Sequence, residues 1–152
     1  SYWGYSGQIH RPLFVGAEPT AAWQRLFDAA LRAYQRISEA LRPRATERDV
    51  IRAASVIGEM GYEIYDELIH GYGVDILPPM IDRSCSQYWP WDDANPAPEG
   101  RRIEANMAIV IQPNPITPDE RMGLQLGALT IVTEAGASSL QKVPLEPIVV
   151  EV

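Results

Sequence analysis

The sequence predicts a domain of the α+β class, and three observations support this prediction. Two segments with helical periodicity lie in the first 60 residues. Several short apolar runs follow, separated by turns that are rich in proline and glycine. No helical pattern separates these runs, so the strands are not linked by the crossover helices of a parallel doubly wound sheet.

Two helices are predicted from the spacing of apolar residues. Between residues 20 and 41, apolar side chains recur at steps of three and four, which places them on one face toward a core. The second helix is expected over residues 46–60. Thr46 and Asp49 have the spacing of a capping box at its start, and Gly61 is a typical stop signal at its end.

Strands and turns account for the rest of the chain. Residues 1–16 have the pattern of a strand and a turn, and residues 62–69 fit either a strand or a short helix. Residues 70–82 are expected to form a turn, a short strand and a turn, and residues 83–100 a long loop. Further strands are predicted over Met107–Gln112, Leu126–Thr133 and Ile148–Val152.

Composition excludes several classes of protein. A length of 152 residues favours one domain. The net charge of −7 argues against nucleic-acid binding, because no basic surface is available to meet phosphates. No apolar run approaches the ~20 residues of a membrane span. The lone Cys85 excludes an internal disulfide, carries no nucleophile motif and is compatible with a reducing compartment. We therefore expect a cytoplasmic protein.

Five short motifs occur in a fixed order along the chain. They are YSGQIHRPLFVG from Tyr5, PRATERDV from Pro43, HGYGVDILPP from His70, NMAIVIQPNP from Asn106 and GLQLGALTIVTEAG from Gly123. In this order they resemble the pita-bread family of methionine aminopeptidase, prolidase, Xaa-Pro aminopeptidase and creatinase. The resemblance implies the pita-bread fold, which is a curved, mostly antiparallel sheet with helices on its outer face. Because strand and turn begin at once, we expect residues 1–152 to be a single partial domain cut from a longer chain.

The same resemblance implies a degenerate metal site. Family enzymes hold two divalent metals with two aspartates, one histidine and two glutamates. Here the first aspartate would lie upstream of Ser1, and only the histidine keeps its residue type. The second aspartate falls on Gln8, the histidine on His70, the two glutamates on Gln112 and Gly127, and a second, proton-handling histidine on Leu77.

Loss of the carboxylates changes the expected chemistry. A glutamine offers a neutral oxygen, and two dications held a few ångströms apart without carboxylates repel each other. We therefore expect no bound metal and no other cofactor, so metal-activated water is not available as a nucleophile.

Several residues have both a functional and a structural interpretation. His70 is either a proton shuttle or a turn histidine that bonds a backbone group. His10, which stands where the family usually has threonine and creatinase has glutamate, faces either a pocket or the surface. Gln8 and Gln112 either line the floor of a pocket with their amides or are uncharged remnants of a metal site that keep the polar core satisfied. The second interpretation is favoured.

The aromatic loop over residues 83–100 has three interpretations. Its aromatic side chains either line a substrate cleft, lie in a dimer seam or cap the sheet. They are Tyr88, Trp89 and Trp91. A cap or a seam is favoured over a cleft.

The resulting functional hypothesis is a prolidase-like or Xaa-Pro-peptidase-like domain that is no longer an active metallopeptidase. It would act as a binding or scaffolding domain, form a homodimer, and take a peptide or a small amide or amidine as ligand. The alternative is a metal-independent, creatinase-like hydrolase of C–N bonds that uses His70 and His10. A carboxylate near His70 would separate the two hypotheses, and Asp75 is the nearest candidate in the sequence.

Overall fold

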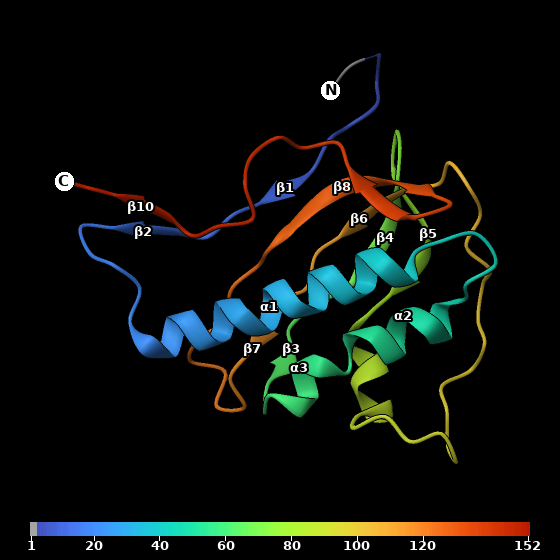
Figure 1. Cartoon of the computed structure of the whole chain (residues 1–152), viewed down its shortest axis with the longest axis horizontal. Coiled ribbons are helices and arrows are strands. Elements are labelled where there is room, and N and C mark those ends of the chain that lie inside the picture. The colour runs from blue at the N-terminus through green and yellow to red at the C-terminus, as the bar shows by residue number, and fades with distance from the viewer. Residues whose placement is uncertain (1–2) are drawn as a thin grey trace.

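An antiparallel sheet and one long helix organise residues 3–152, the part of the chain that the computed structural model describes (Figure 1). Every pair of neighbouring strands in the sheet is antiparallel, as predicted. In spatial order the sheet contains β1 (Ile9–His10), β8 (Gly127–Thr133), β6 (Ala108–Ile111), β4 (Ile69–Tyr72) and β5 (Ile76–Ile81), and β9 (Gly136–Ser139) pairs with β8.

The helix α1 (Ala21–Ala40) confirms the first predicted helix and lies across one face of the sheet (Figure 1). Its apolar stripe is fully buried at Leu26, Ala30 and Ile37. These side chains pack in the same core as Ile109 and Ile111 of the central strand β6. Burial of apolar surface between helix and sheet is the main force that holds the two layers together. Among the described residues, no helix has both the length and the apolar character of a membrane span.

The second predicted helix is divided into α2 (Glu47–Ala54) and α3 (Val56–Glu59). At its start, the Asp49 carboxylate accepts the Thr46 backbone N–H at 2.8 Å, in agreement with the expected capping box. The break comes at Ser55, whose N–H bonds the carbonyl three residues before it instead of four. Gly61 ends the segment with a positive φ of 82°, which a glycine adopts without steric cost.

Two small sheets complete the structure. β2 (Leu13–Val15) pairs in parallel with β10 (Ile148–Val150), and β3 (Glu63–Ile64) pairs antiparallel with β7 (Pro115–Ile116). The three apolar runs predicted as strands form β6, β8 and β10. The hairpin of β4 and β5 is longer than the short strand expected over residues 70–82.

The aromatic loop packs on the helical layer. After a 3₁₀ helix over Arg83–Tyr88, the Trp89 indole N–H donates to the Ile51 carbonyl of α2 at 3.0 Å. The Trp89 side chain also lies against Gly58 of α3. Trp89 therefore caps the helices α2 and α3 and not the sheet, because these helices offer the surface that it covers.

Candidate functional site

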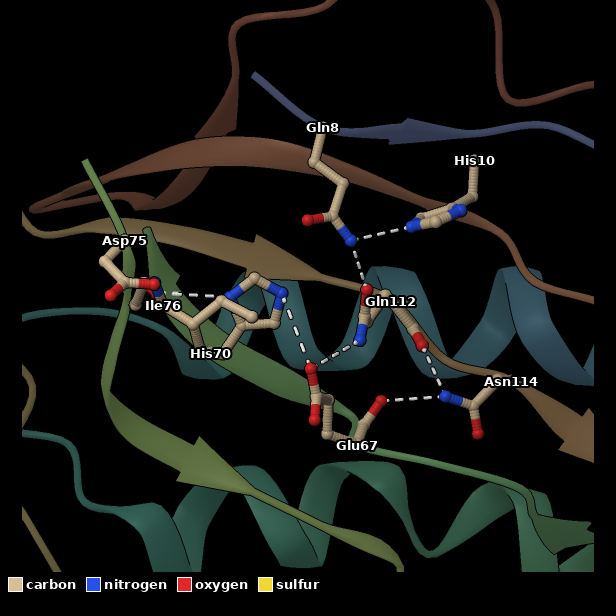
Figure 2. A network of polar contacts seen from close by, with 9 residues as sticks. Gln8, His10, Glu67, His70, Asp75, Ile76, Gln112 and Asn114 are labelled. Carbon is tan, nitrogen blue, oxygen red and sulfur yellow. Dashed lines mark hydrogen bonds and ion pairs between the residues drawn. The ribbon is translucent and has the colours of Figure 1, made fainter. Parts of the chain in front are cut away.

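Four polar side chains from distant parts of the sequence meet at one end of the sheet (Figure 2). Gln8 precedes β1, His70 lies in β4 and Gln112 directly follows β6. Glu67 stands in the loop before β4. The register accounts for the convergence, since His70 pairs with Val110 of β6 and the Gln112 N–H bonds the Leu68 carbonyl at 2.8 Å.

The amides of Gln8 and Gln112 bind each other directly. Gln8 Nε2 donates to Gln112 Oε1 at 2.5 Å and also lies 2.8 Å from His10 Nε2. Gln112 is buried, and every buried side-chain nitrogen or oxygen in the described part of the chain has a hydrogen-bond partner. The buried Gln112 oxygen is therefore satisfied by the Gln8 amide, within a polar patch of the fold.

Glu67 supplies the carboxylate of this cluster. Its Oε1 accepts the Gln112 Nε2 amide at 3.2 Å and lies 3.7 Å from His70 Nε2, which is an ion-pair distance when the imidazole is protonated. The expectation that Asp75 is the nearest candidate was wrong. The Asp75 carboxylate instead accepts the N–H of Ile76 at 2.8 Å, inside its own turn.

His70 lies in the core of the sheet with 1% of its surface exposed. Its Nδ1 lies 3.1 Å from the Gly71 carbonyl oxygen, which can only accept a hydrogen bond, so Nδ1 carries a proton. The Tyr72 ring packs edge-on against the imidazole at 5.2 Å between centroids. His70 therefore bonds a backbone group, as one interpretation expects, but it does so from a strand and beside a carboxylate.

Asn114 fixes the loop that carries Glu67. Its Nδ2 donates to the Glu67 carbonyl at 2.8 Å, and its Oδ1 accepts the N–H groups of Tyr65 and Asp66 at 3.0 Å each. The sequence analysis missed both Asn114 and Glu67. The available signals were a carboxylate three residues before His70 and an asparagine two residues after Gln112.

His10 lies half-buried beside an open cavity of about 600 Å³, which Phe14, Trp23 and Gln125 also line. Burial is the main cause that lowers the pKa of His10 below its ordinary value of 6.5. The charges of His70 and Arg11 act in the same direction, and the Gln112 side chain acts against them. The neutral form is therefore favoured, which agrees with His10 Nε2 as acceptor for the Gln8 amide.

The two remaining predicted positions do not supply polar groups. Leu77 in β5 is 49% exposed. Gly127 is buried at the start of β8, where an added Cβ would press on the Ile111 carbonyl oxygen and lie 2.9 Å from Gln112 Cα. Both are backbone atoms, at the end of β6 and directly after it, so a side chain at position 127 has no room.

These donors do not fit a pair of divalent cations. Position 8 and position 112 carry neutral amides that bond each other, and position 127 carries no side chain. Within residues 3–152, no three His, Cys, Asp or Glu side chains group as metal ligands. Hard cations prefer carboxylate oxygens, and among the four converging side chains Glu67 supplies the one carboxylate.

Comparison with known proteins identifies the family. The model of metallopeptidase family M24 matches residues 1–134, so the chain belongs to this family. No curated protein matches the chain.

Solved structures of the family confirm the pita-bread fold. Dipeptidase PepE from Mycobacterium ulcerans is 27% identical with a TM-score of 0.71, over 93% of this chain and 35% of that chain. The prolidase from Pyrococcus horikoshii is 24% identical with a TM-score of 0.76, over 97% and 39%. The methionine aminopeptidase from Rickettsia prowazekii is 20% identical with a TM-score of 0.70, over 90% and 58%. The chain thus spans less than two thirds of the length of these relatives.

Proposed function

We propose that this M24 domain has a degenerate dinuclear site, is not an active metallopeptidase, and serves as a binding or scaffolding domain for a peptide or a small amide or amidine. The observation that carries the proposal is the hydrogen bond between Gln8 and Gln112. Two positions at which the family resemblance implies anionic metal ligands carry neutral amides that bond each other.

The replaced ligands matter for charge at the reacting centre. A metal pair activates water and stabilises the developing oxyanion, and each effect supplies several kcal/mol in enzymes that use it. The carboxylates that hold such a pair are replaced at positions 8 and 112, and Gly127 has no space for one. Leu77 also removes the proton-handling histidine that the resemblance implies, which is a loss of about 10²–10⁴-fold in rate for general acid–base help.

A second candidate function is metal-independent hydrolysis of a C–N bond, in the manner of creatinase. The observation in its favour is the Glu67 carboxylate 3.7 Å from His70 Nε2. A carboxylate that faces an imidazole orients the ring, which suits a general acid or base. In this candidate His70 and His10 act as the proton-transferring groups and Glu67 as the positioning residue.

A hydrolysis assay separates the two functions. We expect no turnover from a panel of X-Pro dipeptides and creatine-like amidines, with or without chelator. Peptide cleavage that a chelator abolishes would contradict the whole proposal. Chelator-resistant hydrolysis that is lost in His70→Ala and in Glu67→Gln, but kept in the matched control Asp75→Asn, would establish the second candidate instead.

In the same proposal, residues 1–152 form one partial domain and two copies associate as a homodimer. The ribbon of β2 and β10 supports an apolar contact, because it exposes Leu13 at 60%, Val15 at 66% and Val150 at 40%. Sedimentation of the protein tests the association. A sedimentation coefficient that stays that of a monomer at all concentrations would rule out the dimer.

A further inference from the structure

One side chain, that of Arg11, joins β1, β8 and the segment that follows β9. Its Nη1 donates to the His10 and Gly127 carbonyls, at 2.7 Å each. Its Nε donates to the Pro144 carbonyl at 2.7 Å, and its Nη2 donates to the Val143 carbonyl at 3.0 Å. Among the described residues, no carboxylate lies within ion-pair distance of this guanidinium. Backbone carbonyls are therefore the partners of the Arg11 side chain.

The C-terminal segment, residues 140–150, lies along β1 and β2 after the chain leaves β9 (Figure 1). Beyond the contacts with Arg11, the Ile148 N–H bonds the Pro12 carbonyl at 3.1 Å, and β10 pairs with β2. Leu145 packs against the core. The segment is therefore attached both to the core and to the stretch of chain that begins with β1.

The Arg11 bonds fall where the sheet is least secured. β1 is a strand of 2 residues at the edge of the sheet, and its partner there is β8, with His10 opposite Gly127. These are the residues whose carbonyls Arg11 Nη1 joins, so the side chain closes the end of the β1–β8 ladder. A short edge strand has few backbone hydrogen bonds of its own and opens at a low free energy. The Arg11 side chain adds contacts to such a strand.

The same strand sets the position of the paired amides. Gln8, directly before β1, donates to Gln112 at 2.5 Å, and His10 Nε2 lies 2.8 Å from the Gln8 nitrogen. The Gln8 carbonyl accepts the Leu129 N–H of β8 at 2.9 Å. Hydrogen bonds weaken steeply as distance and angle change. A displacement of β1 relative to β8 therefore changes the bond between Gln8 and Gln112.

We propose that Arg11 is a positioning residue of the polar cluster in Figure 2, and that the C-terminal segment acts on Gln8 through its guanidinium. A guanidinium holds its N–H groups in a planar fork and serves several carbonyls at once. A lysine ammonium has three donors on a flexible stem and cannot reproduce the Arg11 bonds. This role rests on the proposed function only in that the polar cluster is taken as the functional site. The test follows the amide pair itself, so its outcome is independent of the hydrolysis assay.

Two variants change the two ends of this link. Arg11→Lys keeps the charge and loses the fork, and Leu145→Ser weakens the attachment of the C-terminal segment to the core. We expect the side-chain NH₂ resonances of Gln8 and Gln112 to shift in NMR spectra of both variants, because the hydrogen bond that these amides share changes its geometry.

Two matched controls change exposed side chains of the same types. They are Arg25→Lys on α1 and Leu140→Ser at the start of the C-terminal segment. We expect the amide resonances to stay at their wild-type positions in both controls. A loss of stability alone lowers the melting temperature of a variant and leaves the spectrum of its folded molecules unchanged. The resonances therefore distinguish positioning from a merely structural role.

The double variant Arg11→Lys with Leu145→Ser tests whether the segment acts through Arg11. We expect the shifts of Arg11→Lys alone, because effects that pass through one shared group do not add. Shifts equal to the sum of the two single variants would overturn the proposal, as would unmoved resonances in Arg11→Lys. If Arg11→Lys does not fold, Leu145→Ser is compared with Leu140→Ser, and amide resonances at equal positions in the two would overturn it.

Discussion

Gln8 and Gln112 are 104 positions apart in the sequence, and their side-chain amides share a hydrogen bond of 2.5 Å. Gln8 precedes β1 and Gln112 follows β6, and the strand between them in the sheet is β8. That strand begins at Gly127, where an added Cβ would lie 3.1 Å from Gln112 Cβ. The lack of a side chain at Gly127 and the pairing of the Gln8 and Gln112 amides across β8 are therefore linked.

The first prediction concerns Gly127. Gly127→Ala places a Cβ against the Ile111 carbonyl oxygen and 2.9 Å from Gln112 Cα. Backbone atoms in the centre of a sheet move only with their strand, so we expect a loss of about 1–3 kcal/mol in the free energy of unfolding. Urea denaturation followed by circular dichroism measures the loss.

Gly123→Ala is the matched control for this prediction. Its added Cβ would have nothing nearer than 3.5 Å, which is ordinary van der Waals contact. We expect a change within about 0.5 kcal/mol, as for most surface substitutions. Equal stability of the two variants would contradict the steric argument, and with it the view that a glutamate at position 127 does not fit.

The second prediction concerns metal binding by the wild-type protein. Calorimetric titration with Mn²⁺, Co²⁺ or Zn²⁺ should show no two-ion binding at micromolar affinity, because the amides at positions 8 and 112 are neutral and the Gln112 oxygen already accepts the Gln8 amide. One weakly held ion at His70 is compatible with this expectation. Two tightly bound ions per chain would show that the site is not degenerate.

Partial restoration of the ligands extends this prediction. The double variant Gln8→Asp with Gln112→Glu returns two carboxylates to the site, but Gly127 still supplies none. We expect at most weak metal binding and little activity toward X-Pro dipeptides. Micromolar binding of two ions by this variant would show that position 127 is dispensable.

Much of the fold was predictable because it depends on local pattern. The apolar stripe over residues 20–41 predicts α1 to within a residue at each end. The apolar run around Val110 predicts a buried strand, which is β6. The break at Ser55 was not predictable, since one hydrogen bond to the carbonyl three residues before it shortens the turn within a continuous apolar pattern.

The residues that form the site were harder to predict from the sequence. The positions 8, 70, 112 and 127 came from motif order, and the structure brings the first three together with Glu67. Glu67 has no motif of its own. Its place depends on the loop that Asn114 holds, and the turn between β3 and β4 is a tertiary feature that no sequence period encodes.

The third prediction concerns Cys85. Burial raises the pKa of its thiol to about 12 from an ordinary value of 9.0, and the nearby Asp82 charge adds to the effect. Only the thiolate reacts with disulfide reagents, so the shift alone lowers the reactive fraction by about 1000-fold. We expect labelling of the native protein to be slow and labelling in denaturant to be fast. Rapid labelling of the native protein would show that Cys85 is accessible and ionised.

The fourth prediction concerns pH and His10. Burial lowers the pKa of this imidazole in the folded protein below 6.5, its ordinary value, and the charges of His70 and Arg11 lower it further. Between these two pKa values the unfolded chain binds more protons than the folded protein, so protons favour unfolding there. The contribution of His10 to stability is therefore fully present above pH 6.5 and is lost as the pH falls through the folded-state pKa.

The variant His10→Gln tests this contribution. A glutamine oxygen at position 10 can still accept the Gln8 amide but does not titrate. We expect its free energy of unfolding to fall less steeply than that of the wild type as the pH drops below 6.5, and the two curves to run parallel above that value. Because the protein has two histidines, NMR of the imidazole resonances in wild type and variant assigns His10 directly. A wild-type curve no steeper than that of His10→Gln, or an imidazole that titrates at or above 6.5 in the folded protein, would contradict the assignment of His10 as a half-buried neutral acceptor.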